Sequence, residues 1–432
     1  MKRGAHALCI GFLLTCCPLA QADDATDAPS SEAKSARAPM KLSWEWRQGL
    51  LYKIRPLVGD LPGLAPAEQR AINGRVAAKL HIDGAIYRDD DEFPGVEDGI
   101  EIRRARVYTI GSSYFLSPLT YKLEFGFDGT GWFLHEAYVW WLDVPLLNSL
   151  KFGNISVPFS LESLESSRDT TLMEMGSPVE AFSPGIRLGA MAHGLERDDR
   201  LTWSLGWFAD VEEFSVGDAS ESVQSLNGRL TYLPYDEFTE DTHSMIHTGV
   251  SVSFSQSKDG AFQYRSRPES FLAPRLVDTG SIDADDGFLY GLELAGVHGP
   301  FSLQAEFIQV HLFDLPRDLH FEGGYIYGSW FLTGESRPYR VQRGVFGQVK
   351  PRKDFSWKHR TWGAFELTAR LSRLDLSNEQ IRGGEMNIVM GGFNWYWNPY
   401  VRLMFNAGYA DISDTDETGD LALLQTRVQM QF

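Results

Sequence analysis

Cysteine is nearly missing from this 432-residue chain: Cys9, Cys16 and Cys17 are the only three, and all lie near the N-terminus. If that stretch is removed as an export signal, no thiol is left for a disulfide, a thiolate metal site or a cysteine nucleophile. Long apolar runs are also missing, since none reaches the 18 or so residues that a membrane-spanning helix needs. This excludes a helical membrane protein. It leaves a membrane β-barrel open, because barrel strands need only alternate.

Basic residues are also fewer than acidic residues. The chain has 40 Lys and Arg against 58 Asp and Glu, a net charge of −18. A dedicated nucleic-acid binder normally carries a basic face, so we expect no nucleic-acid partner. Apolar residues, in contrast, make up 43% of the chain and aromatic residues 13%. That composition is sufficient for a large core or for a lipid-facing wall.

The N-terminus is typical of an export signal. Lys2 and Arg3 form a basic start, an apolar stretch covers 8–15, and Ala22 ends a small-residue pattern before the expected cut. We predict residues 1–22 as the signal peptide; a lipoprotein signal is the weaker alternative, because no small-residue lipobox precedes a cysteine. The cut chain would carry 38 basic and 58 acidic residues, a net charge of −20. We then expect an N-terminal leader and periplasmic segment at 23–75 and a barrel at 76–432.

The barrel region alternates apolar and polar residues with a period of two, which is typical of strands. In the last segment, even-numbered positions from Ala422 to Phe432 share one face, while Gln425, Arg427 and Gln429 share the other. The terminal Phe432 resembles the sorting signal of bacterial outer-membrane barrels. The same alternation in 361–373 predicts which side chains face lipid and which face water. Phe365, Leu367 and Leu371 should face lipid, and Glu366, Thr368 and Arg370 should face water.

We predict an all-β fold, a transmembrane antiparallel β-barrel of about 16 strands with inward-folding loops. The expected strands are 76–88, 100–113, 119–128, 131–143, 148–159, 186–195, 201–212, 222–234, 243–256, 286–297, 299–313, 319–334, 360–374, 384–397, 399–412 and 419–432. An even count returns both ends to the periplasm, and sixteen strands leave a water-filled lumen. A soluble sandwich is the alternative. The signal peptide, the terminal Phe and aromatic residues at strand ends favour the barrel.

Two connections are longer than simple turns. Residues 160–185 are expected to fold into the lumen as a constriction, with a surface loop as the alternative. Residues 335–360 hold eight basic and two acidic residues, a charge of +6 in an acidic chain. Strand parity places this segment at the periplasmic mouth, where it would line the water path and attract anions; a solvated turn that binds nothing is the alternative. Its candidate residues are Arg337, Arg340, Arg343, Lys350, Arg352 and Lys353.

Several stretches resemble the phosphate-selective porin O/P family. They include EIRRARV (101–107), FGNISVPFSLE (152–162), SWFLTGESRPY (329–339) and FNWYWNP (393–399), and they follow the family's order over most of the chain. The resemblance implies a sixteen-stranded barrel in the bacterial outer membrane, usually a homotrimer. It also implies a channel that passes anions through a basic constriction. The partners would be small inorganic anions, outer-membrane lipid and lipopolysaccharide.

The resemblance also implies an anion-binding constriction. Arg103 and Arg104 match the family's arginine pair, and Arg168, Ser166 and Ser167 match its inward loop. The basic set is thinner here, which puts phosphate selectivity in doubt. The departures are His135 where the family has an acid, and Ser163 and Thr120 near positions where it has lysines.

Arg103 and Arg104 pose a physical problem, because adjacent strand residues point to opposite faces. Both reach the lumen only through a β-bulge; otherwise one faces a subunit interface. A bare guanidinium in lipid costs about 2–4 kcal/mol near the midplane.

Catalytic and metal-binding patterns are weak in this sequence. His243 and His247 share a strand face but lack further ligands at useful spacing. We therefore expect no enzyme activity, no metal and no cofactor. The sequence predicts a porin for passive diffusion of small, phosphate-like anions. A general or weakly cation-selective pore and a structural or adhesive barrel plugged by its loops are the alternatives.

Overall fold

The computed structural model describes residues 41–46, 52–57, 73–88, 93–113, 119–127, 131–196, 198–210, 223–238, 242–257, 262–313, 318–378, 381–415 and 417–432. The predicted signal peptide lies outside these residues. Within them, no helix has the length and apolar character needed to cross a membrane.

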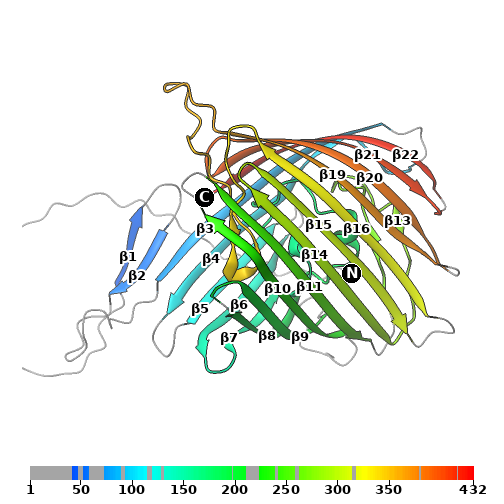
Figure 1. Ribbon diagram of the computed structural model, residues 1–432, viewed down its shortest axis with the longest axis horizontal. Helices are drawn as coiled ribbons and strands as arrows, with labels where there is room; N and C mark the ends of the chain where they lie inside the picture. The colour runs from blue at the N-terminus through cyan, green and yellow to red at the C-terminus, as the bar shows by residue number, and fades with distance from the viewer. Residues whose placement is uncertain are drawn as a thin grey trace, which may run out of the picture. The chain divides into compact units, whose positions relative to one another are not determined.

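Sixteen antiparallel strands of the described chain close into a barrel (Figure 1). They are β3 (Asn73–Arg88), β4 (Gly99–Ser113), β5 (Leu119–Phe127), β6 (Trp132–Val144), β7 (Asn148–Ser156), β8 (Ile186–Glu196), β9 (Leu201–Ala209), β10 (Gln224–Phe238), β11 (His243–Gln256), β14 (Asp286–His298), β15 (Phe301–Phe313), β16 (Leu319–Phe331), β19 (Ala364–Asn378), β20 (Ile381–Tyr396), β21 (Val401–Ser413) and β22 (Gly419–Gln431). Each pairs with its neighbours in sequence, and β22 pairs with β3 through Met430 and Leu80 to close the ring. The predicted fold class and strand number are confirmed.

A short hairpin precedes the barrel and pairs with its first strand. It consists of β1 (Lys41–Trp46) and β2 (Tyr52–Leu57), and β2 pairs with the start of β3 through Tyr52 and Val76. No strand is predicted here from the sequence, because six-residue strands next to a Pro- and Ala-rich leader give little periodic signal.

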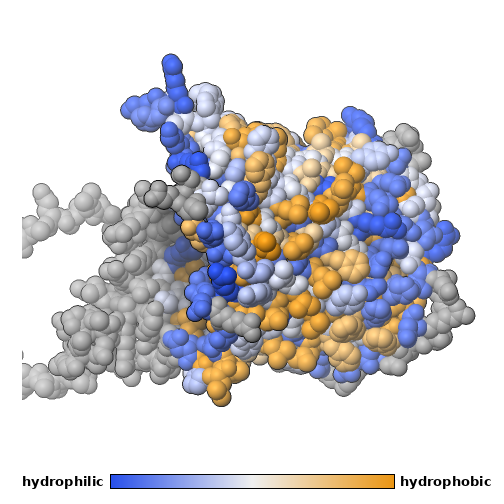
Figure 2. All heavy atoms as spheres, in the orientation of Figure 1, coloured by the Kyte–Doolittle hydropathy of each residue, from blue (hydrophilic) through white to orange (hydrophobic). Residues whose placement is uncertain are grey.

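The wall has an apolar outside and a polar inside, the inverse of a soluble sandwich. On β19, Leu367 and Leu371 are 41% and 56% exposed, whereas Glu366 and Arg370 are 1% exposed because they point into a filled lumen. Figure 2 shows orange residues spread over the wall and blue residues gathered toward the barrel ends. The faces predicted for this strand are confirmed, and they match those of a membrane barrel.

The connections differ between the two barrel ends. At the end that holds the C-terminus they are short, as at 145–147, 239–242 and 299–300, with 332–363 as the exception. At the other end, long connections such as 157–185 and 257–285 occur. Short turns mark the periplasmic end of such barrels.

Three inserts fill much of the lumen. The first insert, 157–185, carries α1 (Leu161–Leu164) and α2 (Ser177–Phe182). The second insert, 262–285, carries β12 (Arg265–Ser266) and β13 (Val277–Asp278). The third insert, 332–363, carries β17 (Tyr339–Arg340), η3 (Val341–Arg343) and β18 (Val345–Phe346). The inward fold predicted for the first insert is confirmed, while that of the second was not predicted.

Apolar packing fixes the first two inserts against one side of the barrel. Val179 and Phe182 of α2 and Tyr264 of the second insert share one buried cluster with inward residues of β14–β16 and β19–β22, such as Phe321 and Met390. This side of the lumen is therefore filled. Open space remains on the opposite side, along β3–β7.

Candidate functional site

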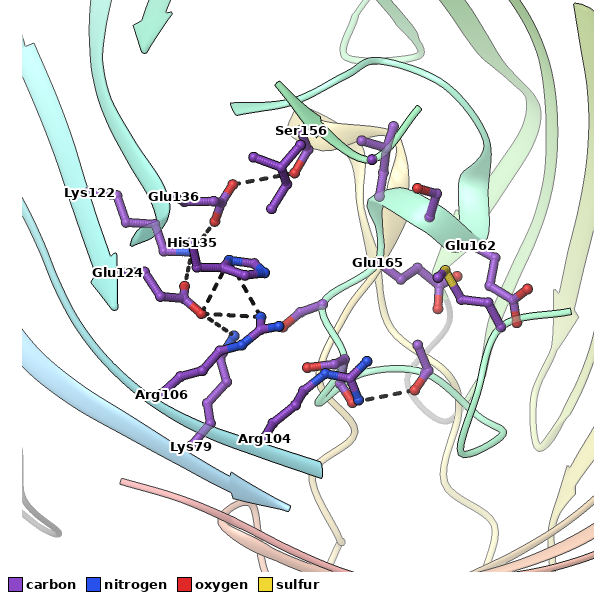
Figure 3. Close-up of a pocket in the computed structure, with 18 of the residues that line it drawn as sticks. Lys79, Arg104, Arg106, Lys122, Glu124, His135, Glu136, Ser156, Glu162 and Glu165 are labelled. Atoms are coloured by element: carbon purple, nitrogen blue, oxygen red, sulfur yellow. Dashed lines mark hydrogen bonds and ion pairs between the residues drawn. The ribbon is translucent and has the colours of Figure 1, made fainter. Parts of the chain in front are cut away.

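A chamber of about 510 Å³ lies between the inner face of β3–β7 and the first insert (Figure 3). The strands contribute four basic side chains to its lining, and the inserts contribute hydroxyl groups, acids and one arginine. The basic residues of the wall are Lys79, Arg104, Arg106 and Lys122. The insert residues include Glu162, Glu165, Ser166, Ser167, Glu174 and Arg343.

A β-bulge turns both arginines of the 103–104 pair inward. The pairing of β3 and β4 runs from His81–Arg104 directly to Ile82–Ile102, so Arg103 has no partner in the ladder. The extra residue lets two successive side chains lie on the lumen side. Ile102 before them points outward and is 56% exposed. The problem raised by the sequence is resolved by the first of its two expected solutions.

The two arginines then differ in what they bind. Arg103 is held by Glu174 of the first insert, with Nε donating to Oε1 at 2.9 Å and Nη2 to Oε2 at 3.0 Å. Its guanidinium also lies over the ring of Phe271, 3.5 Å from the centroid. Arg103 therefore fastens the two inserts to the wall and has no free fork for a solute.

Arg104 keeps most of its hydrogen-bonding capacity free. Its Nη1 lies 3.8 Å from Oε1 of Glu174, beyond hydrogen-bond distance. Its Nε and Nη1 have no hydrogen-bond partner among the described residues. Figure 3 shows this side chain projecting from the wall toward the insert. Both atoms are buried within a side chain that is 12% exposed, so Arg104 lines the chamber as a guanidinium whose Nε and Nη1 are not used by any described residue.

The cations around Glu174 also fix its charge. Burial alone would raise the pKa of this carboxyl, but Arg103, Arg104 and Arg427 outweigh burial and hold its pKa well below the usual value. Glu174 is thus a carboxylate that joins the first insert to strands β4 and β22.

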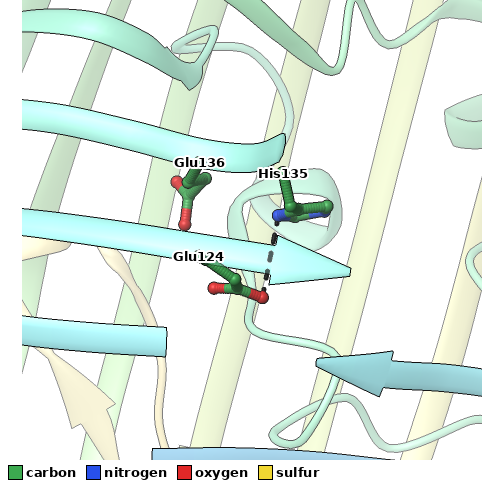
Figure 4. A group of neighbouring side chains, drawn as sticks. All are labelled: Glu124, His135 and Glu136. Carbon is green, nitrogen blue, oxygen red and sulfur yellow. Dashed lines mark ion pairs between the residues drawn. The ribbon is translucent and has the colours of Figure 1, made fainter. Parts of the chain in front are cut away.

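A second bulge lies on β6. The pairing with β5 runs from Glu124–Glu136 directly to Phe125–Leu134, which leaves His135 unpaired in the ladder. As a result, His135 and Glu136 both reach the lumen, and with Glu124 they bring three potential ligand atoms within 4.8 Å of one another (Figure 4). This group is not predicted from the sequence, because adjacent strand residues are expected on opposite faces.

Basic neighbours neutralise this group. Lys122 contacts the carboxylates of both Glu124 and Glu136, and Arg106 Nη1 lies 3.4 Å from Glu124 Oε1. Lys79 Nζ lies 3.6 Å from the same oxygen. The arrangement is a network of ammonium, guanidinium and carboxylate groups, and a metal ion would have to displace its cations.

On the filled side of the lumen, charges are locked in buried pairs. Arg370 donates to Glu269 Oε2 from Nε at 2.9 Å and to Glu162 Oε1 from Nη1 at 3.1 Å. Arg229 pairs with Glu293 at 2.7 Å. Arg370 connects the barrel wall to the first two inserts, and Arg229 connects β10 to β14 and to the third insert.

The predicted constriction residues of the first insert lie in different places. Ser166 and Ser167 line the chamber. Arg168 lies beside it and donates from Nε to Asp169 Oδ1 at 3.1 Å. The structure therefore brings Arg104, Ser166 and Ser167 together, and it sets Arg103 and Arg168 into ion pairs.

The basic residues of the third insert are distributed along its course. Arg337 is buried in the lumen and donates from Nη2 to Glu165 at 3.0 and 3.1 Å, and Arg340 lies 3.3 Å from Asp169. Arg343 lines the chamber. Three others, Lys350, Arg352 and Lys353, are exposed. The insert thus reaches the chamber from the periplasmic end and contacts the first insert, which enters from the other end.

Sequence reasoning missed three basic residues of the chamber wall, Lys79, Arg106 and Lys122. The signal that could have identified them is parity. Each occupies a polar position in an alternating strand, on the face opposite to the apolar residues.

The family comparison agrees with this geometry. A family model described as phosphate-selective porin O and P matches residues 75–432. The chain belongs to the phosphate-selective porin O and P family. As a member of that family with a closed membrane barrel, it is an outer-membrane porin, and the predicted family and location are confirmed.

Individual relatives are distant. Porin O of Pseudomonas aeruginosa is 25% identical over 365 residues, covering 74% of this chain and 80% of the relative. An uncharacterised Caulobacter vibrioides protein is 27% identical over 409 residues, covering 91% of this chain and 76% of the relative. Both relatives support the membership of this porin in the family.

Solved structures share the fold at low sequence identity. The trimer form of OmpT from Vibrio cholerae superposes with a TM-score of 0.53 at 11% identity, covering 84% of this chain and 99% of that one. An anion-selective porin from Comamonas acidovorans gives 0.50 at 11% identity, covering 84% and 100%. These similarities establish the barrel architecture of the porin.

Proposed function

We propose that this porin passes small anions, including phosphate-like ions, by passive diffusion through the chamber between β3–β7 and the first insert. The observation that carries the proposal is Arg104, whose Nε and Nη1 face no hydrogen-bond acceptor among the described residues. A guanidinium can donate two parallel hydrogen bonds to the oxygens of a phosphate group.

The charge balance of the chamber supports an anion path. Each acid in the chamber lining forms an ion pair with at least one cation. The pairs are Lys122 with Glu124 and Glu136, Arg370 with Glu162, Arg337 with Glu165, and Arg103 with Glu174. Arg343 has no ion pair among the described residues, and Arg104 has only its long contact with Glu174. The two arginines thus leave surplus positive potential in a confined space, which concentrates anions.

The neighbouring groups would complete a weak site. Ser166 and Ser167 offer hydroxyl groups on the insert side of the chamber, and Ser167 Oγ has no hydrogen-bond partner among the described residues. A passage site has to release its ion as readily as it binds it. One free arginine with two hydroxyl groups fits that requirement better than a closed ring of cations.

Arg168 and the mouth residues would act at longer range. Arg168 lies beside Asp169 at the edge of the chamber, and Arg340 and Arg343 extend the basic surface toward the periplasmic end. Lys350, Arg352 and Lys353 are exposed on the third insert. We propose that they raise the local concentration of anions at that mouth. Arg337 has its charge engaged by Glu165 and would serve to hold the insert in place.

Assembly and surroundings belong to the same proposal. We propose a homotrimer, supported by the trimer form of the structurally similar Vibrio cholerae porin. Lipopolysaccharide would surround the rim with the long connections, and phospholipid would surround the end with short turns.

Two other functions have specific support. Five acidic residues line the chamber, which favours a general or weakly cation-selective pore if their ion pairs exchange readily. Three inserts fill much of the lumen, which favours a plugged structural barrel. Conductance in a planar bilayer separates the plugged barrel from both pores.

The sign of selectivity tests the proposal. The reversal potential across a KCl gradient should show anion preference in the natural protein, and Arg104→Gln should reduce it. The matched control is Arg373→Gln, whose side chain is 63% exposed and paired with Glu385 on the outer face of β19; it should leave the reversal potential unchanged. Cation preference in the natural protein would contradict the proposal.

A further inference from the structure

The third insert has an outer part that does not enter the lumen. Residues 354–362, the tip of the third insert, leave the barrel at the end that holds the C-terminus and project clear of the wall, in gold in Figure 1. The tip is ordered by its own hydrogen bonds: Ser356 and Thr361 pair through their backbones at 2.9 and 3.2 Å. Phe355 N donates to Trp397 O at 2.6 Å, which fastens the tip just beyond the end of β20.

The tip displays tryptophans to the outside. Trp357 is 75% exposed and Trp362 is 51% exposed. Their rings are 5.6 Å apart, and both contact Phe355, at 5.0 and 6.0 Å. Exposed tryptophans on a loop that is held in place by hydrogen bonds are unusual for a surface that contacts only water.

The aromatic cluster continues onto the lipid-facing wall. Phe355 also contacts Trp395 at 5.5 Å, and Trp395 Nε1 donates to Trp362 O at 2.7 Å. From Trp395 a row of rings runs across the outer face through Phe365, Phe393 and Phe405, at centroid distances of 5.8 to 6.2 Å. The exposed tryptophans are therefore contiguous with the surface that lipid covers.

Basic side chains lie next to these tryptophans. Lys358 and Arg360 are exposed, and neither has an ion pair among the described residues. The single acid of the tip is Asp354. Figure 2 shows hydrophilic residues projecting at the corresponding place above the wall. The tip thus combines an amphipathic aromatic surface with positive charge.

We propose that this tip binds anionic glycerophospholipid in the periplasmic leaflet of the outer membrane. Trp357 and Trp362 would lie at the level of the glycerol and headgroup region, where indole rings are favoured. Lys358 and Arg360 would contact the headgroup phosphate. The barrel end is the one with short turns, which is the periplasmic end.

Lipid fits this tip better than a protein partner or the conduction path. The tip's rings continue the lipid-facing row rather than a separate patch, so the occupant of that row also meets the tip. The tip projects away from the lumen, whereas Arg337, Arg340 and Arg343 of the same insert lie inside. Its charge therefore faces the membrane surface.

The test uses the full-length protein in mild detergent, with the midpoint of heat unfolding as the readout during titration with phosphatidylglycerol. A basic residue close to an anionic lipid surface contributes about fivefold in affinity, corresponding to about 1 kcal/mol. The pair K358Q/R360Q should therefore need roughly 25-fold more phosphatidylglycerol for half of the full shift. Phosphatidylcholine should give little shift with either protein. Trp357→Ala should weaken the response to phosphatidylglycerol, because it removes interfacial aromatic surface without altering charge.

The matched control is R373Q/R382Q, which also removes two exposed basic residues but at the opposite rim. It should retain the natural response. An unchanged response in K358Q/R360Q would overturn the proposal. An equal shift with inorganic phosphate in place of the lipid would also overturn it. If K358Q/R360Q lost the trimer but kept its lipid response, the tip would instead belong to a subunit contact.

Discussion

The two sides of the lumen use the same residue types in opposite ways. Along β14–β22 the inserts pack against the wall, and the guanidinium of Arg370 lies between Glu162 and Glu269 with 1% of its side chain exposed. Along β3–β7 a chamber remains, and it is lined by Arg104, two of whose buried donors have no acceptor among the described residues. The difference lies in whether an insert carboxylate reaches the arginine.

This comparison separates arginines that build the channel from those that face the solute. The adjacent pair of β4 shows it most clearly, since Arg103 is held in both of its fork positions by Glu174 and Arg104 is not. A basic residue in a porin lumen therefore indicates an anion site only when its donors are not already used. Local pairing matters more here than the net charge of the chain.

The largest effect is expected on the filled side. Arg370→Gln would leave the buried carboxylates of Glu162 and Glu269 without their cation, and breaking a buried pair of this kind costs about 3–5 kcal/mol. We expect the free energy of unfolding in urea, measured in lipid vesicles, to fall by that amount. Arg373→Gln on the same strand, whose pair is exposed, should change it by less than about 1 kcal/mol. Equal effects of the two variants would show that the locked pairs are not structural.

A second effect concerns the link between the two sides at Glu174. Its folded pKa lies well below the unfolded value of about 4.5, so its ion pairs contribute stability above that pH, and the contribution is lost as the pH falls toward the folded pKa. We expect the natural protein to lose stability on acidification below about pH 4.5 more steeply than Glu174→Gln. The midpoint of heat unfolding against pH provides the measurement. Identical pH profiles would mean that Glu174 does not hold the insert.

The smallest effect is expected at the periplasmic mouth. Exposed charges are screened over about 8–10 Å near physiological salt, so the triple variant of Arg343, Lys350 and Arg352 to Gln should lower anion preference in about 0.1 M salt and much less in about 1 M. Reversal potentials at the two salt concentrations give the comparison. No change at low salt would place the third insert outside the conduction path.

The barrel was predictable from the sequence because period-two alternation is a local signal that repeats sixteen times. Strand 243–256 was predicted with the bounds that the structure has. The β1–β2 hairpin and the inward fold of 262–285 were not predicted. Their positions depend on contacts with distant strands, such as those of Tyr264 with Phe182 and Phe321, which leave no periodic trace.

The candidate site was predictable only in part. The resemblance identified Arg103 and Arg104, and strand parity could have identified Lys79 and Lys122. The bulges at Arg103 and His135 could not be located from parity, because a bulge interrupts that very pattern. The position of the Glu174 carboxylate decides which of the two arginines keeps unpaired donors. That position follows from the fold of the whole first insert.

Phosphate block of the chloride current tests most directly whether Arg104 is the solute-facing arginine. In a planar bilayer, phosphate should reduce the current of the natural protein, and Arg104→Gln should raise the concentration for half block at both low and high salt, because a confined site is screened less than an exposed one. Arg103→Lys, which keeps a cation beside Glu174, should change the half-block concentration much less. If Arg104→Gln leaves the half-block concentration unchanged, or if Arg103→Lys raises it equally, the distinction between the two arginines is wrong.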